Sequence, residues 1–346
     1  MNNKFHYYIS ASLDNNFLRW IIEYIIEIIG LVPVAQKNID EKTNLVYGQN
    51  QTDEKSPFIT IPHHSSHLIE ESILKNTADK NILQEFDIIT AIGKFLSDTV
   101  NETKPADSYD IHGRLNSLDS FQYDIDYQDQ PIVNIYIRFF KEIVQQTFSF
   151  DYTPLLPKGK KSVIILSHDV DDPDKYAILK SYKLLPENLT LKNTLLYHTK
   201  AIEKAAKRFL KRDEKEFWLF EDVMNAESKY DFKSTFFFSA RNRFDKYAHF
   251  KYDVPYDISS PDFSSVFKQM NERGFEIGIH GSYLANKNPD IFKEEIDRLE
   301  KYSNRKILGN RYHYWQIGAK PEKTLQSHAE IGLVYDSSLA FNDAPG

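Results

Sequence analysis

The stretch SVIILSHDVDD, residues 162–172, joins an uninterrupted apolar run to a group of acidic residues and a histidine. A short apolar run bounded by charged residues predicts a strand that is buried on both faces, here Ser162–Ser167. In parallel sheets, reactive side chains follow the carboxyl ends of the strands. The stretch therefore predicts an α/β fold, with Asp169 and Asp171 at the edge of the sheet where a site would lie.

Further short apolar runs extend this pattern toward the end of the chain. They predict four more strands, at Lys233–Ser239, Phe275–Ile279, Ile307–Gly309 and Ile331–Tyr335. Between the later ones, helix-forming stretches are predicted at Asp262–Arg273, Pro289–Tyr302 and Pro321–Glu330. This alternation is typical of a (β/α) barrel or a doubly wound sheet. The charged stretch from Lys175 to Ala226 is long for one connection and predicts an inserted helical region of about residues 175–226.

The first part of the chain has a different character and mixes short apolar runs with polar stretches. A buried amphipathic helix is predicted within Trp20–Pro33, ending at Gly30. A strand is predicted at Pro57–Ile61, and helices are predicted at Ile82–Leu96 and Gln130–Phe148. The segment Pro154–Lys161 has the composition of a linker. We therefore predict a smaller α+β or α/β domain of unknown role at 1–155, followed by a catalytic domain at 156–346.

Composition limits the classes of function. The 346 residues suggest about two domains, and 41% apolar with 27% charged residues is typical of a soluble globular protein. The net charge of −7, with no long basic run, argues against nucleic acid as a partner. The chain has no cysteine, which excludes disulfides, thiolate catalysis and cysteine-bound zinc. Any metal must therefore be bound by His, Asp or Glu.

No targeting or membrane segment is predicted. Met1–Asn16 has no basic segment followed by an apolar stretch, as a signal peptide would. The apolar run Trp20–Pro33 is interrupted by Glu23 and Glu27, and it is shorter than the roughly 20 residues that a span needs. We expect a cytoplasmic protein without a membrane span; the sequence does not indicate its oligomeric state.

Chemically reactive residues follow four of the predicted strands. The segments are HDVDD at 168–172, HGSY at 280–283, NRYHY at 310–314 and DSS at 336–338. Asp169 and Asp171 are two residues apart, so on an extended segment they share a face. One carboxylate could bind a divalent cation while the other acts as base on its water. The alternatives are a turn or capping pair for the two Asp, a backbone-bonded histidine at 280, and an ordinary ion pair for Arg311.

These segments resemble the polysaccharide deacetylases of carbohydrate esterase family four. The family's paired-aspartate motif is similar to LSHDVD at 166–171, and its strand-end histidine motif is similar to FEIGIHGSY at 275–283. Its arginine motif is similar to RYHY at 311–314, and a later region to GLVYDSS at 332–338. The resemblance covers about residues 160–346. It is greatest to the branch in which such a domain follows an uncharacterised N-terminal domain.

The resemblance implies a distorted (β/α) barrel that removes N-acetyl or O-acetyl groups from a glycan with a divalent metal, usually Zn²⁺. By position, Asp169 would be the general base, and Arg311 would orient it. Asp171 and His280 would be metal ligands. The expected contacts with the glycan are Ser282, Tyr283, Tyr312, Tyr314 and Trp315.

Two departures from the family pattern matter. The family has another histidine four residues after the first, where this chain has Leu284. We predict that His313, which stands where the family has proline, is the third metal ligand; alternatively it lines the groove. The family's histidine acid comes from a late strand, and the chain ends at Gly346, so we expect the C-terminal strands to be absent. His328 is predicted on the exposed side of a helix, and His168 is a weaker alternative acid.

Other functions remain open at this stage. A catalytically impaired carbohydrate-binding or scaffold protein on the same fold is favoured by Leu284 and the absent last motif. An amidase acting on a non-sugar C–N bond would use the same metal chemistry. In the N-terminal part, His63, His64 and His67 have helical metal-ligand spacing, but a polar helix start is the preferred interpretation.

Overall fold

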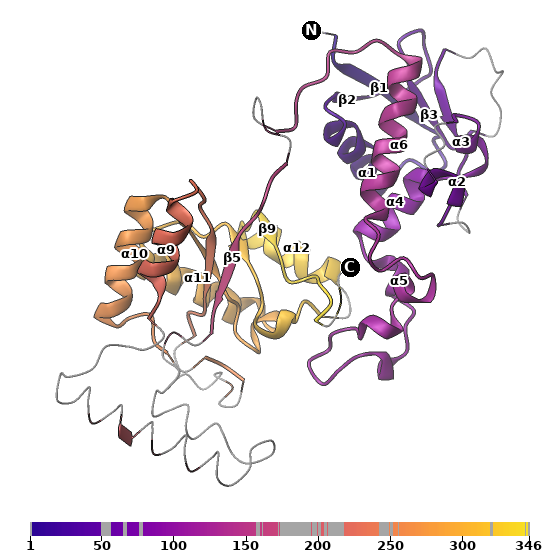
Figure 1. Ribbon diagram of the computed structural model, residues 1–346. Helices are drawn as coiled ribbons and strands as arrows, with labels where there is room; N and C mark the ends of the chain where they lie inside the picture. Colours follow the sequence, from indigo (N-terminus) through magenta and orange to yellow (C-terminus); the bar gives the residue numbers. More distant parts are fainter. Residues whose placement is uncertain are drawn as a thin grey trace. The chain divides into compact units, whose positions relative to one another are not determined.

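The structure is a computed structural model, and its contacts divide the chain into two compact units (Figure 1). Unit 1 comprises residues 1–108, 116–163 and 343–346, and unit 2 comprises 109–115 and 164–342. Each unit is described by itself. The described residues are 2–346 except for these: 50–56, 65–67, 76–78, 157–159, 161, 172, most of 174–217, 242–248, 250–251, 255, 319–320, 343 and 345–346.

Unit 1 contains a four-stranded, wholly parallel sheet. Its strands are β1 (Lys4–Ile9), β2 (Val32–Ala35), β3 (Leu45–Tyr47) and β4 (Ile59–Ile61), in the order β2-β1-β3-β4. In the register, Tyr7 of β1 lies opposite both Ala35 of β2 and Leu45 of β3. The strand order reverses beside β1, as in doubly wound sheets. Of these strands the sequence predicted only β4. Because all four strands are parallel, unit 1 is an α/β rather than an α+β structure.

The helices of unit 1 pack with the sheet around one core. They are α1 (Asn16–Ile28), α2 (Glu71–Leu74), α3 (Ile82–Glu85), α4 (Ile88–Leu96), α5 (Phe121–Asp124) and α6 (Ile132–Thr147), with 3₁₀ turns η1 (Thr99–Asn101), η2 (Ala106–Ser108) and η3 (Ser117–Asp119). Helix α1 begins earlier than the predicted region, after the N-cap Asn15. Its end agrees with the prediction, because Gly30, with φ +95°, follows it. The single helix predicted over 82–96 is wrong in one respect. The buried side chain of Asp87 caps the amide of Thr90 and starts a new helix, α4.

Unit 2 contains a five-stranded parallel sheet. Its strands are β5 (Ser167–Val170), β6 (Thr235–Phe238), β7 (Glu276–Ile279), β8 (Gly309–Asn310) and β9 (Tyr335–Asp336), and each pairs with the next in chain order. Phe236 of β6, for example, lies opposite His168 of β5 and Ile277 of β7. The predicted α/β class with parallel sheets is confirmed. Closure of this sheet into a barrel stays a prediction.

Helices connect the strands of unit 2. They are α9 (Phe220–Ser228), α10 (Pro261–Arg273), α11 (Pro289–Ser303) and α12 (Pro321–Ile331), with 3₁₀ turns η4 (Ala285–Lys287) and η5 (His313–Trp315). The last three helices confirm the predicted ones, and Gly274, at φ +75°, ends α10 as expected. Most of the predicted insertion at 175–226 lies outside the described residues, apart from the start of α9. The core of unit 2 is rich in phenylalanine, for example Phe238, Phe263 and Phe267.

Two of the predicted strands of unit 2 begin about four or five residues later than expected. Strand β5 starts at Ser167 rather than Ser162, and the side chains of Val163, Ile164 and Ile165 are 61–86% exposed. Apolar composition alone cannot make a strand where no neighbouring strand supplies backbone hydrogen bonds, and β6 pairs only from position 167 onward. Likewise, β9 begins at Tyr335, because Ile331 still belongs to helix α12.

Candidate metal centre

Three predicted ligands meet at the carboxyl edge of the sheet of unit 2. The Oδ1 atom of Asp171 lies 3.1 Å from Nε2 of His280 and 3.4 Å from Nδ1 of His313, and the two nitrogens are 2.9 Å apart. Tetrahedral zinc with ligand bonds of about 2.0–2.2 Å needs donor atoms roughly 3.3–3.6 Å apart. The residues therefore fit a divalent cation, with small adjustments in spacing. Among the described residues, these three form the one cluster of His, Asp and Glu that could hold a metal ion.

Each of the three residues reaches this point from a different strand. Asp171 follows β5, His280 follows β7, and His313 lies three residues beyond β8. His280 is 1% exposed, and its Nδ1 donates a hydrogen bond to the backbone oxygen of Arg311 at 2.6 Å. This bond orients the ring so that Nε2, the atom that could bind a metal in the neutral imidazole, faces Asp171 and His313. Leu284, where the family has a histidine, only precedes the turn η4.

The charges at this cluster are strongly coupled. Burial acts to raise the pKa of Asp171, but hydrogen bonds from His280 and His313 outweigh it and hold that pKa well below its ordinary value. Burial acts to lower the pKa of His280, and the hydrogen bond and charge of Asp171 outweigh it and raise that pKa. The carboxylate and an imidazolium thus stabilise each other. A cation that replaced the imidazole proton would take over the same role.

A second carboxylate lies beside the cluster, held in a fixed orientation. Asp169 stands two residues before Asp171, and its Oδ1 accepts a bond from Nη1 of Arg311 at 3.0 Å. The same guanidinium donates to the hydroxyls of Ser167 and Ser337, at 3.0 and 3.1 Å. It also lies over the ring of Phe237, 4.7 Å from the centroid. The guanidinium of Arg311 is thus held by more contacts than that of an arginine in an ordinary surface ion pair.

The expected glycan contacts fall into two groups. Ser282 and Tyr312 are each 2% exposed; the first bonds to Glu295, and the second to His328 with Nε2 2.9 Å from its hydroxyl. These two side chains support the loops from inside. Tyr314 and Trp315 are partly exposed, at φ +59° and +54°. Consecutive left-handed aromatic residues are uncommon and costly, and such strain concentrates at functional sites.

An aromatic group beside His313 includes residues that the sequence did not indicate. His112, in the segment 109–115 of unit 2, stacks on Tyr314 with ring centroids 4.2 Å apart. Its Nδ1 lies 3.1 Å from the hydroxyl of Tyr283, whose ring stacks on Tyr252 at 4.4 Å. In sequence, His112 is far from the other residues of unit 2, which begin at 164. It also follows none of the strands of that sheet, so no local signal could identify it.

Three other described histidines that the sequence had raised as candidates take no part in the cluster. His168 bonds through Nε2 to Glu227 Oε1 at 2.7 Å, on the opposite face of β5 from Asp169. His328 was predicted to be exposed, which is wrong: it is 4% exposed, because α12 packs it against Tyr312. In unit 1, His63 lies in a loop after β4 rather than at a helix start, 3.1 Å from the buried Asp87. His67 lies outside the described residues.

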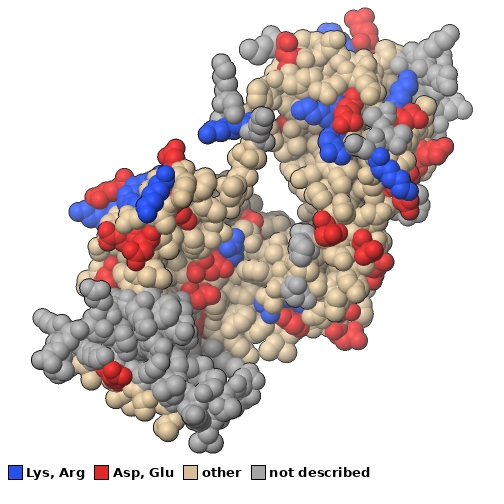
Figure 2. Space-filling model, in the orientation of Figure 1, with Lys and Arg blue, Asp and Glu red and all other residues tan. Residues whose placement is uncertain are grey.

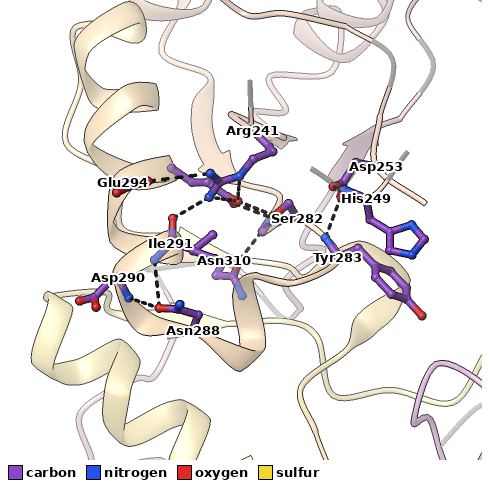
Figure 3. A network of polar contacts seen from close by, with 12 residues as sticks. Arg241, His249, Asp253, Ser282, Tyr283, Asn288, Asp290, Ile291, Glu294 and Asn310 are labelled. Atoms are coloured by element: carbon purple, nitrogen blue, oxygen red, sulfur yellow. Dashed lines mark hydrogen bonds and ion pairs between the residues drawn. The ribbon is translucent and has the colours of Figure 1, made fainter. Parts of the chain in front are cut away.

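Polar side chains hold the loop that follows His280 (Figure 3). The backbone amide of Ser282 donates to Glu295 at 3.0 Å, and that of Tyr283 to Asp253 at 2.8 Å. The amide of Gly281 is 3.4 Å from Oδ1 of Asn310. Glu295 and Asp253 are not among the predicted site residues, because neither directly follows a predicted strand. The loop is therefore fixed at three consecutive residues.

Comparisons with known proteins identify only the first part of the chain. Residues 7–149 match a family of unknown function, DUF7033. No curated protein and no solved structure matches the chain. The family match ends before Asp169 and so does not include the cluster. The resemblance to polysaccharide deacetylases stays a prediction.

The surface and the helices bear on the expected partners. On the faces drawn in Figure 2, acidic and basic side chains are interspersed, and the described residues there form no continuous basic surface. Within the described part of the chain, no helix is long and apolar enough to cross a membrane.

Proposed function

We propose that unit 2 is a metal-dependent hydrolase of the polysaccharide deacetylase type, which removes acetyl groups from a glycan. The observation that carries this proposal is the convergence of Asp171, His280 and His313 beside an Asp169–Arg311 pair. The strand order supports it as well, because strictly sequential parallel strands place all their right-handed connections on one face, as in a (β/α) barrel.

The three converging residues would hold the metal, which we propose to be Zn²⁺. One carboxylate oxygen and two imidazole nitrogens form a donor set that suits this borderline cation and leaves a position open for water or substrate. When bound, the ion would supply Lewis-acid polarisation of the acetyl carbonyl and would lower the pKa of a water.

The residues around the metal position have separable roles. Asp169 would accept the proton of the attacking water, and Arg311 would hold this carboxylate in its orientation. Tyr314 and Trp315, which are partly exposed, would contact the sugar, since aromatic faces suit the apolar face of a sugar ring. Ser282, Tyr283 and Tyr312, which are 2–9% exposed, would act by supporting the loops rather than by touching the glycan.

Metal content and acetate release together test this proposal. The full chain, purified without chelator, should bind one equivalent of zinc. Asp171→Ala and His280→Ala should lose it, whereas His168→Ala, on the opposite face of β5, should keep it. Asp169→Asn should keep zinc but lose acetate release from N-acetylated oligosaccharides.

Each other outcome has a defined meaning. If the wild-type chain binds no zinc at micromolar concentrations, the metal site is wrong. Zinc binding with no acetate release from N-acetylated or O-acetylated glycans would favour an amidase for non-sugar C–N bonds. Zinc-independent binding of the oligosaccharides, unchanged in Asp171→Ala, would favour a carbohydrate-binding protein.

A further inference from the structure

The spacing of the two histidines depends on the backbone of the segment that follows β7. The oxygen of Gly281 accepts the amide of His313 at 2.9 Å, and His280 donates its Nδ1 proton to the oxygen of Arg311. These contacts link the loop after β7 to the loop after β8. The distance between the two imidazoles is therefore set by where residues 281–283 are held.

Glu295 of helix α11 makes the largest share of the contacts that hold this segment. Its Oε2 accepts the amide of Ser282 at 3.0 Å, and its Oε1 accepts the Ser282 hydroxyl. Asn310 and Asp253 accept the amides on either side (Figure 3). Glu295 therefore holds Ser282, the middle residue of the segment, which lies two residues after His280.

The charge of Glu295 is buried and paired. The residue is 1% exposed, and its Oε1 lies 2.8 Å from Nε and from Nη2 of Arg241, which is 5% exposed. Arg241 Nη2 also donates to the backbone oxygen of Ile291 at 2.9 Å, which ties the pair to the start of α11. Replacing such a buried ion pair by apolar residues is often neutral or stabilising. Stability alone is thus a weak explanation for the pair, whereas positioning accounts for both bonds that Glu295 accepts from Ser282.

We propose that Glu295, held by Arg241, is a positioning residue that sets the separation of His280 and His313 and thereby the affinity for the divalent metal. The proposal rests on the metal site proposed above. It assigns a functional role to two residues that touch neither metal nor substrate.

Zinc affinity in a charge-free variant tests the role. In the full chain, Arg241→Met combined with Glu295→Leu removes both charges and leaves no buried charge unpaired. Zinc affinity, measured by competition with a chelating dye, should fall about 10–100-fold, as for other outer partners of metal ligands. The visible absorption of the Co²⁺-substituted protein should change as well, because it reports ligand geometry. The thermal midpoint should fall, because the buried amide and hydroxyl of Ser282 lose their acceptor, so both ions are measured well below it.

A second ion pair on the same helix provides the matched control. Arg298 of α11 binds Asp257 at 2.6 Å, away from the 281–283 segment. Arg298→Met with Asp257→Asn should leave both zinc affinity and the Co²⁺ spectrum unchanged. Glu295→Gln, which keeps an acceptor for the Ser282 amide, should retain more affinity than Glu295→Leu.

The failures are distinguishable. A folded Arg241→Met, Glu295→Leu variant with wild-type zinc affinity and Co²⁺ spectrum overturns the positioning role and leaves the metal site standing. If that variant does not fold, Ser282→Ala combined with Glu295→Gln removes the hydroxyl contact and weakens the amide contact, and wild-type zinc affinity and Co²⁺ spectrum there overturn the role. A wild-type chain that binds neither ion overturns the metal site, and the positioning role with it.

Discussion

Replacing Arg311 with lysine should slow catalysis while leaving the metal site intact. The guanidinium donates to Asp169, Ser167 and Ser337 at 3.0–3.1 Å. A lysine ammonium keeps the positive charge but cannot reproduce this planar set of three bonds. Only the backbone oxygen of Arg311 contacts His280, and the substitution preserves that oxygen. The variant thus separates orientation of the base from binding of the metal.

The expected magnitude follows from the lost bond to Asp169. A hydrogen bond to a charged group contributes about 1.5–3 kcal/mol. At about 1.4 kcal/mol for each factor of ten, this corresponds to a fall in kcat/KM of roughly 10–150-fold. Arg311→Lys should lie near the lower value, because its ammonium can still form one charged contact with the Asp169 carboxylate. Arg311→Met should lie near the upper value and should also lose the contact with Phe237.

The assay measures acetate release and zinc affinity on the same preparations. Arg298→Lys, which changes a partly exposed ion pair of α11, serves as the control and should alter neither quantity. Unchanged kcat/KM in Arg311→Lys would refute the role of the guanidinium in aiming the base. A parallel loss of zinc would refute the separation between base and metal ligands.

Three further predictions concern stability. Asp87→Asn should destabilise unit 1 by about 2–4 kcal/mol, because several donors to its buried carboxylate lose their partner; hydrogen exchange across helix α4 would measure this. Gly309→Ala should cost about 1–3 kcal/mol in chemical denaturation, since a Cβ there would lie 1.9 Å from the ring of Tyr335. Burial acts to raise the pKa of Asp257, but hydrogen bonds from a backbone amide and from Arg298 outweigh it and lower that pKa below 3.8. Thermal midpoints of the wild type should therefore fall more steeply than those of Asp257→Asn as the pH drops from about 4 to well below 3.8, through the lowered pKa of the folded protein.

The fold of unit 2 was largely predictable because its signals are local. The TFFF strand β6 and the capped helices α10, α11 and α12 carry periodicity and end signals that need no tertiary information. The strand-end rule also predicted that the segments containing Asp171, His280 and His313 lie at the same edge of the sheet. Strands β1, β2 and β3 of unit 1 were missed, because short mixed runs resemble loops until the sheet pairs them.

Glu295 shows where a usable signal was overlooked. Glu294 and Glu295 are adjacent, yet the side chain of Glu294 is 67% exposed, whereas Glu295 is 1% exposed. The apolar positions Ile291 and Leu299 lie four residues before and after Glu295, on the buried stripe of α11. A carboxylate on an apolar stripe must be paired or hydrogen-bonded, so its position predicts a buried partner. The identity of that partner, Arg241 after β6, depends on tertiary packing.

The proposed ligand positions have a structural consequence. In a site with histidines at positions 280 and 284, both imidazoles would belong to one loop, and their spacing would be set locally. With Leu284 and His313, the imidazoles come from loops after two different strands, β7 and β8, and only tertiary contacts can fix their separation. Those contacts are present: Gly281 binds the backbone of His313, and the loop of Gly281 is braced from α11. A metal site assembled in this way should be more sensitive to substitutions in its supporting shell than one built on a single loop.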